Sequence, residues 1–208
     1  MRSHLALLSL VALSGCALGF GDPTDSGFAT PDASGDLSRV DSGARSGSDF
    51  SALTGNGYGN QVGAVDDDGL QGFAGLVSGA TVSAPLTTGS TTMTGDFELA
   101  VIDFIIQNGT SVTGQSTLDR GNLTLNVDFE NRRVTGGGTG LDGGISNIVL
   151  DNNVLAVDGQ FVGDALTGTV TYDGVSGPLR GLVGSNEAIG AFHGHSDNQV
   201  HAGGFIVN

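Results

Sequence analysis

Three histidines near the end of the chain are the side chains best suited to ligand chemistry. His193, His195 and His201 lie close together in the sequence, and the only other histidine is His4. Neutral imidazoles bind Zn²⁺, Cu²⁺ and haem iron. On a strand His193 and His195 share one face, whereas His201 either approaches them across a hairpin or lies on the opposite face with Phe205. They form a candidate metal or haem site; the alternative is exposed turn histidines in a glycine-rich loop.

Cys16 is the only cysteine among the 208 residues, and it follows the apolar run Leu5–Ser14. A run of about ten residues is too short to span a bilayer but is typical of a secretory signal. Ser14 and Gly15 place small residues before the cysteine, as in the lipobox at which bacterial lipoproteins are cleaved and acylated. We expect residues 1–15 to be a lipoprotein signal peptide and Cys16 to carry acyl chains such as palmitate. The alternative is an ordinary secreted protein with an unmodified cysteine.

The residue after the cysteine and the net charge bear on location and partners. Ala17 stands where enterobacterial lipoproteins of the inner membrane usually carry Asp. We therefore expect the protein to be lipid-anchored at the outer membrane of a Gram-negative bacterium, on either its periplasmic or its surface face.

The net charge is −15, with seven Arg and no Lys. Such a chain should not bind nucleic acid or an anionic membrane electrostatically.

Residues 16–85 have the composition of an acidic, flexible tether. The part Ala17–Asp49 is rich in Gly, Ser, Asp, Thr and Pro, and such segments bury too little apolar surface to fold alone. Phe50–Leu53 and Leu70–Val77 are short apolar islands that could pack on the following domain as a helix or strand. Asp66–Asp68 is interpreted as a solvated charge run, with a calcium ligand as the alternative.

Residues 86–208 predict an all-β domain, an eight-stranded antiparallel soluble β-barrel. The pattern is clearest in Leu123–Asp128, where apolar and polar residues alternate. Eight strands close a barrel that side chains can fill. The outward residues are Thr, Asn and Asp, not the apolar band of a membrane barrel. The expected strands are Ser90–Phe104, Leu123–Asp128, Val134–Gly138, Leu155–Phe161, Leu166–Tyr172, Leu179–Val183, Ala188–Phe192 and Val200–Val207.

Three stretches of this domain resemble the transferrin-binding-protein-B-like β-barrel family. Thr87–Phe97 resembles its opening strand, TxGxxxYxGxF, with Met93 at the usual Tyr. Leu166–Val170 resembles its central strand, and Gly190–Phe205 resembles its closing hairpin. Histidines occupy three positions of that hairpin where the family usually has an aromatic residue, Pro and Glu. The residues expected to close the barrel are Gly190, Phe192, Gly194, Gly203, Gly204 and Phe205.

The resemblance implies a binding function. Members of the family are lipid-anchored outer-membrane proteins, some of which capture transferrin, haem-carrier proteins or complement regulators. We expect ligand capture, the ligand being a host or nutrient protein, haem or a metal. The alternative is a structural envelope or surface-coat lipoprotein with no small-molecule ligand. No nucleophile–base pair or paired carboxylate motif predicts an enzyme. We expect no resident cofactor, and haem or Zn²⁺ would be bound as ligand. The oligomeric state is left open.

Overall fold

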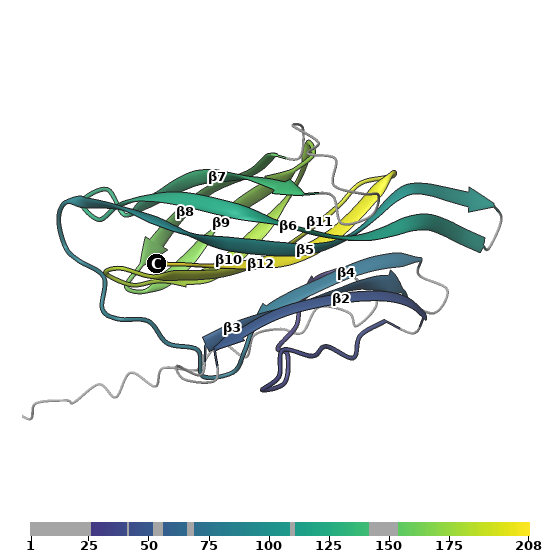
Figure 1. Ribbon diagram of the computed structural model, residues 1–208, viewed down its shortest axis with the longest axis horizontal. Helices are drawn as coiled ribbons and strands as arrows, with labels where there is room; N and C mark the ends of the chain where they lie inside the picture. The colour runs from purple at the N-terminus through teal and green to yellow at the C-terminus, as the bar shows by residue number, and fades with distance from the viewer. Residues whose placement is uncertain (1–25, 41, 52–55, 66–68, 109–110, 142–153) are drawn as a thin grey trace, which may run out of the picture.

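Residues 26–208 contain twelve strands in the part of the chain that the structure describes (Figure 1). The structure is a computed structural model, and no helix that could cross a membrane occurs in the ranges described. The signal peptide, Cys16 and Asp66–Asp68 lie outside these ranges, so their predictions remain predictions. The ranges described are 26–40, 42–51, 56–65, 69–108, 111–141 and 154–208.

The last eight strands form a closed antiparallel barrel in the order β10-β11-β12-β5-β6-β7-β8-β9. Each strand pairs with both of its neighbours, and β9 pairs with β10 to close the ring. This confirms the predicted fold class. The strands are β5 (Ser90–Asn108), β6 (Ser111–Asp128), β7 (Arg133–Leu141), β8 (Val154–Val162), β9 (Ala165–Tyr172), β10 (Val175–Val183), β11 (Ala188–His195) and β12 (Gln199–Val207).

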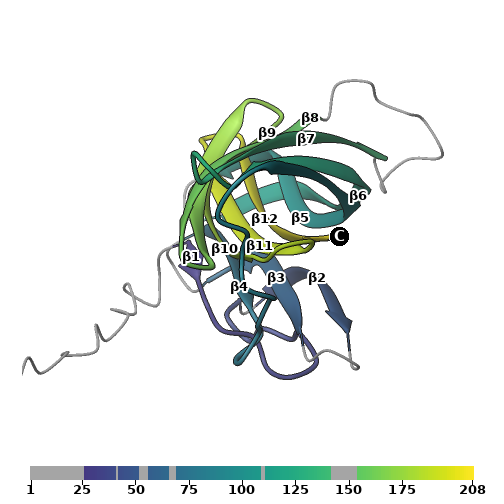
Figure 2. The same ribbon diagram turned by 90° about the vertical axis from the view of Figure 1, so that its left-hand side faces the viewer.

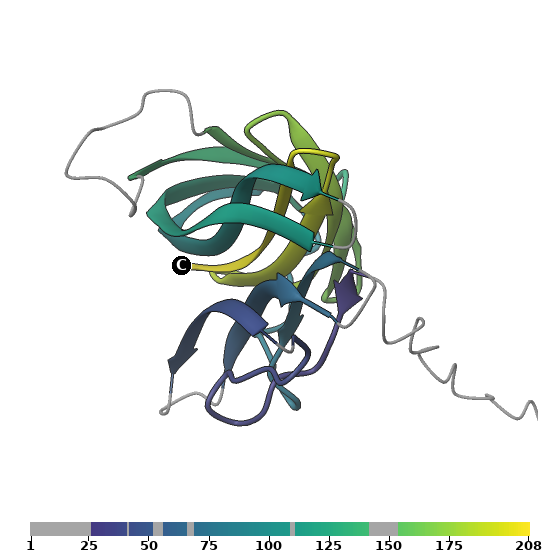
Figure 3. The same ribbon diagram turned by 90° about the vertical axis from the view of Figure 1, so that its right-hand side faces the viewer.

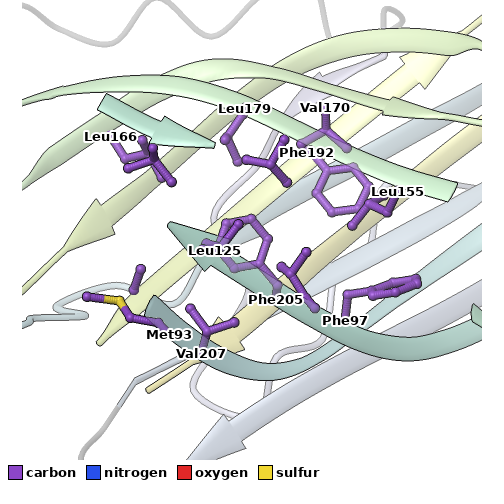
Figure 4. Packing of buried hydrophobic residues seen from close by; sticks show 14 of the residues in the cluster. Met93, Phe97, Leu125, Leu155, Leu166, Val170, Leu179, Phe192, Phe205 and Val207 are labelled. Carbon is purple, nitrogen blue, oxygen red and sulfur yellow. The ribbon is translucent and has the colours of Figure 1, made fainter. Parts of the chain in front are cut away.

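Alternating residues of the eight strands fill the barrel lumen. In β6, Leu123, Leu125 and Val127 are at most 1% exposed, and the polar residues between them face outward. Because successive side chains of a strand point to opposite faces, this alternation gives one apolar and one wet surface. Phenylalanine and aliphatic side chains from all eight strands meet inside (Figure 4). The lumen is therefore a packed hydrophobic core.

Bare glycine backbone in the closing hairpin makes room for large rings. A Cβ on Gly190 would lie 2.4 Å from Cζ of Phe205, and a Cβ on Gly203 would lie 2.8 Å from Cζ of Phe192. Both rings are completely buried. Glycine is required at these two positions because any side chain would occupy the volume of a core phenylalanine.

A second sheet of four strands covers one side of the barrel. Its order is β1-β4-β3-β2, with β1 parallel to β4 and the other pairs antiparallel. Figures 2 and 3 show it stacked on the outer wall of the barrel, where it contacts β11, β12 and β5. These strands are β1 (Gly27–Phe28), β2 (Ser42–Ser51), β3 (Asn56–Ala64) and β4 (Leu70–Leu76).

Within the described part of residues 16–85, this sheet corrects the expectation of a flexible tether. The island Leu70–Val77 contains a strand, β4, which packs on the barrel. The glycine-rich composition did not indicate that this segment has an apolar face. On that face the side chain of Tyr58 is 2% exposed and that of Val62 is 0% exposed. That face meets small barrel residues, including Ala202, so that the two backbones lie close together and few large side chains are needed.

Candidate functional site

The three histidines of the closing hairpin do not form one site. His201 is completely buried inside the barrel. His193 lies on the outer wall, where its ring meets Phe28 of β1 edge-on with 4.9 Å between the centroids. The side chain of His195 is exposed. No group of three metal-ligating side chains occurs in the ranges described. The structure thus corrects the idea that the three imidazoles bind one metal ion or haem.

The register of the hairpin explains why they separate. In the β11–β12 pair, His201 is the direct partner of Gly194, which lies between His193 and His195. Direct partners share a face of the sheet, and sequence neighbours do not. His201 consequently faces the lumen together with Phe205, while the other two histidines face outward.

Inside the lumen, His201 belongs to a polar cluster at one end of the hydrophobic core. Its Nδ1 lies 3.2 Å from Oε1 of Gln199, and Nε2 of Gln199 donates to Oδ1 of Asp103 at 2.9 Å. Beside it, the hydroxyl of Tyr172 donates to Oδ2 of Asp119. Since the amide oxygen of Gln199 only accepts, Nδ1 of His201 carries the hydrogen. Nε2 is then an acceptor, and it has no hydrogen-bond partner.

Burial keeps His201 neutral. It lowers the pKa of the imidazole from 6.5 to about 3, with a smaller contribution from His193. Burial also raises the pKa of Tyr172, assisted by its hydrogen bond to Asp119, so the phenol remains protonated. The cluster therefore joins the strands at this end of the barrel through polar contacts within a packed interior.

An open site lies instead between the second sheet and the barrel. This groove has a volume of about 610 Å³ and is lined by residues of β2, β3, β5, β6 and β7. Three of its lining residues carry carboxylates and one is an arginine, and the ring of Tyr58 also lines the groove. The charged residues are Asp49, Asp96, Glu98 and Arg120.

Strand geometry positions the charges on the barrel side of the groove. Asp96 and Glu98 alternate with Phe97 on β5, so Phe97 enters the core and the two carboxylates face outward. Arg120 of β6 is the direct partner of Glu98 in the ladder, and Nε of Arg120 donates to Oε2 of Glu98. The Glu98 side chain is only 11% exposed, while that of Arg120 is 68% exposed. The pair thus consists of a fixed carboxylate and an accessible guanidinium.

The second sheet contributes Asp49, Tyr58 and a buried amide. Burial, followed by the carboxylates of Glu98 and Asp49, raises the pKa of Tyr58, whose phenol stays protonated. Asn60 is 1% exposed, and neither polar atom of its amide has a hydrogen-bond partner. Its Nδ2 and Oε1 of Glu98 both lie within 3.0 Å of the point that a Cβ on Gly47 would occupy. An unsatisfied amide therefore lies beside the carboxylate at the inner side of the groove.

Sequence reasoning missed this groove because three of its ten lining residues belong to the predicted tether. The alternation Asp96, Phe97, Glu98 on a predicted strand was the available signal, since it places two carboxylates on one outer face. Nothing in the sequence indicated that Asp49 and Tyr58 would be brought opposite them.

The molecule is thus an all-β protein in which an eight-stranded barrel and a docked sheet enclose a charged groove. No protein-family model matches the sequence, and no curated protein matches it. Solved structures that resemble it include intact Ap-TbpB with its N and C lobes, at 14% identity and a TM-score of 0.42 over 78% of this chain. The haemoglobin receptor HpuA from Kingella denitrificans is similar at 13% sequence identity, with a TM-score of 0.41 over 74% of this chain.

A third similar structure is isotype 1 transferrin binding protein B from serogroup B Neisseria meningitidis, at 11% identity and a TM-score of 0.43 over 74% of this chain. The match covers 38%, 55% and 30% of those three chains, respectively, so this protein spans about a third to a half of their length. Neither the identities nor the TM-scores assign it to a family.

Proposed function

We propose that this protein is a lipid-anchored binding protein of a Gram-negative outer membrane, and that the groove between its sheet and barrel receives a basic segment of a protein ligand. The groove itself carries the proposal: three carboxylates and one arginine line an open volume of about 610 Å³ between the second sheet and the barrel. The lipobox at Cys16 supports the anchor. This function is capture and involves no chemical conversion of the ligand.

Charge favours a cationic ligand. The net charge of −15 attracts basic partners from solution, and carboxylates form strong charge-assisted hydrogen bonds with Arg and Lys. Glu98 is nearly buried, so its charge is screened less by water than that of a surface carboxylate. The arginine or lysine of a ligand can replace Arg120 at Glu98, because the Arg120 side chain is largely exposed and free to move away.

An extended peptide also fits the backbone at the groove. Strand β2 is at the edge of its sheet, and no strand in the ranges described pairs with its outer side. Edge strands bind extended segments through main-chain hydrogen bonds. Ser48 and Asp49 of β2 line the groove, so a segment added to this edge would place its side chains beside the carboxylates.

The test measures binding of a fluorescent Ac-Gly-Arg-Gly-Arg-Gly amide to the full-length protein in lipid nanodiscs. We expect saturable binding that weakens with salt and falls roughly tenfold or more in Glu98→Gln, the range expected for a lost hydrogen bond to a charged group. Asp158→Asn is the matched control, since it removes one negative charge at an exposed ion pair with Arg133. Equal losses in the two variants would show that net charge, not the groove, attracts the peptide.

The structural alternative, a coat protein of the envelope, has one observation in its favour. Phe104 is 74% exposed and follows Asp103, the last residue of β5 that pairs with β12. Beyond this point β5 and β6 extend past the other barrel strands (Figure 1). A photo-crosslinker at this position in intact cells distinguishes the two functions. Adducts between copies of the chain support a coat, whereas adducts with a different protein support capture.

Cys16→Ala tests the anchor separately. We expect this variant to leave the membrane fraction, because without the cysteine no acyl chain can be attached and no other anchor is predicted. Retention of the variant in washed membranes would overturn the lipoprotein assignment.

A further inference from the structure

A second hollow, with a volume of about 360 Å³, lies at the opposite edge of the docked sheet from the charged groove. It is formed by β1 and β4 of the sheet and by β9, β10 and β11 of the barrel. We propose that this pocket, named here the Arg180 pocket, binds a small monocarboxylate with an apolar body. The inference is independent of the proposed capture of a basic peptide, which uses other residues and the opposite charge.

Small residues create the hollow. Five of the eleven residues that line it are Gly or Ala, whose side chains cannot fill the space between sheet and barrel. Phe28 and Leu76 add apolar walls from the sheet side, so that most of the lining is hydrophobic. The volume is near the lower end of the range for small-molecule pockets, roughly 300–1,000 Å³. A short alkyl chain or a single ring therefore suits it better than a large cofactor.

Arg180 is the only charged residue in the lining. Its guanidinium carbon lies 4.4 Å from the centroid of the Phe28 ring, a cation–π contact that restrains the side chain. Within the described part of the chain no carboxylate forms an ion pair with it, in contrast to Arg120 and Arg133. An arginine held by a ring offers its planar fork of N–H donors to a carboxylate, which can accept two of them.

The surroundings of Arg180 favour a ligand with one negative charge. The ring of Phe28 that contacts Arg180 also contacts the imidazole of His193. Burial, followed by the charge of Arg180, lowers the pKa of His193 to about 4. The imidazole is consequently neutral near pH 7 and adds no positive charge. Thr30 and Thr167 supply hydroxyl groups to the same lining. One guanidinium, two hydroxyls and apolar walls match a carboxylate head with a hydrocarbon body.

The experiment compares octanoate with octanamide, which has the same chain and no charge. Calorimetric titration uses the full-length protein in nanodiscs, with empty nanodiscs subtracted to remove partitioning into lipid. We expect saturable binding of octanoate, at least tenfold weaker binding of octanamide, and at least a tenfold loss of octanoate affinity in Arg180→Gln. Octanamide affinity should be the same in Arg180→Gln and in the unmodified protein.

Further variants test the shape of the pocket separately from the charge of Arg180. Ala165 is an exposed residue of the lining, so Ala165→Leu should fill the hollow without disturbing the core and should weaken both ligands. Thr169→Leu adds a similar side chain to the exposed face of the same strand outside the pocket, and Arg133→Gln removes a cation elsewhere; neither should change binding. Absence of saturable octanoate binding, or octanoate affinity unaffected by Arg180→Gln and Ala165→Leu, would overturn the proposal. Glu98→Gln should leave octanoate binding intact, so that the two sites fail separately.

Discussion

The barrel lumen and the junction between the barrel and the second sheet are packed in opposite ways. The lumen is filled by large side chains, among them Phe97, Phe192 and Phe205, that come from strands linked in a continuous hydrogen-bonded ring. At the junction, the ring of Tyr58 rests on bare backbone at Gly204 and on alanines of β5, β11 and β12. No strand pairing joins the two sheets in the ranges described.

This difference assigns them different roles. A ring of paired strands cannot open at one place without losing ladder hydrogen bonds and core packing together, so the barrel should unfold as one unit. The second sheet shares no strand ladder with the barrel, so we expect it to separate with little effect on the barrel. Both open sites, the charged groove and the Arg180 pocket, lie at this weaker junction. The protein therefore combines a stable support with binding surfaces that a single substitution can disrupt.

The largest effect is expected in the lumen. Phe205 is completely buried, so Phe205→Ala should lower the free energy of unfolding by about 3–5 kcal/mol, the usual loss for a core aromatic. Urea denaturation followed by circular dichroism measures it. Val162→Ala, at a site 75% exposed, is the control and should change stability by less than about 0.5 kcal/mol. Similar midpoints for the two variants would mean that the lumen does not dominate stability.

A smaller and local effect is expected at the junction. A Cβ on Gly204 would lie 2.2 Å from Cδ2 of Tyr58, so Gly204→Ala must push the second sheet away from the barrel. We expect a loss of about 1–3 kcal/mol, the range for overpacking. Hydrogen exchange should accelerate for amides of β3 and β4 while those of β6 and β8 stay protected.

Tyr58→Ala provides the control for this clash. In that background the ring is absent, and Gly204→Ala should cost clearly less than in the unmodified protein, as a double-mutant cycle would measure. Additive losses, or exchange that accelerates equally in β6 and β8, would show that sheet and barrel form one cooperative unit.

The sequence predicted the barrel because its signal is local. Alternation such as that of Leu123–Asp128 is visible within one strand, and the eight predicted segments all lie within the strands of the barrel. The second sheet escaped prediction because its stabilising partners are distant. Val62 and Ala74 form an apolar face only when the barrel supplies Ala202 and its neighbours, and composition alone resembles that of a flexible segment.

The candidate sites depended on information that one sequence does not contain. The faces of His193 and His201 follow from the hairpin register, and a shift of one residue between β11 and β12 would have placed both on the same face. The groove needed the docking of Asp49 near Glu98, a contact between elements that are not paired. The sequence therefore identified side chains capable of binding a ligand, but it did not show which of them lie together in the folded protein.

The buried His201 and the half-buried His193 distinguish the lumen from the junction by the pH dependence of stability. His201 faces the lumen and His193 faces β1, and burial is the main cause that lowers their pKa values to about 3 and about 4. In the unfolded chain both imidazoles have a pKa near 6.5. Between those values the unfolded chain binds protons that the folded chain does not, so stability should fall as the pH drops below about 6.5. Each histidine contributes at most about 1.4 kcal/mol of unfolding free energy per pH unit.

Urea unfolding between pH 6.5 and pH 5 tests this sign and separates the two regions. We expect His201→Gln to flatten the pH dependence of global unfolding measured by circular dichroism, because the lumen unfolds only with the whole barrel. His193→Gln should instead flatten the pH dependence of hydrogen exchange in β4, because His193 lies under the second sheet, against Phe28 of β1, which pairs with β4. His195→Gln removes an exposed imidazole of the same strand and serves as the reference. Equal slopes in His201→Gln and His195→Gln, or a stability that rises toward pH 5, would contradict a neutral buried histidine in the lumen.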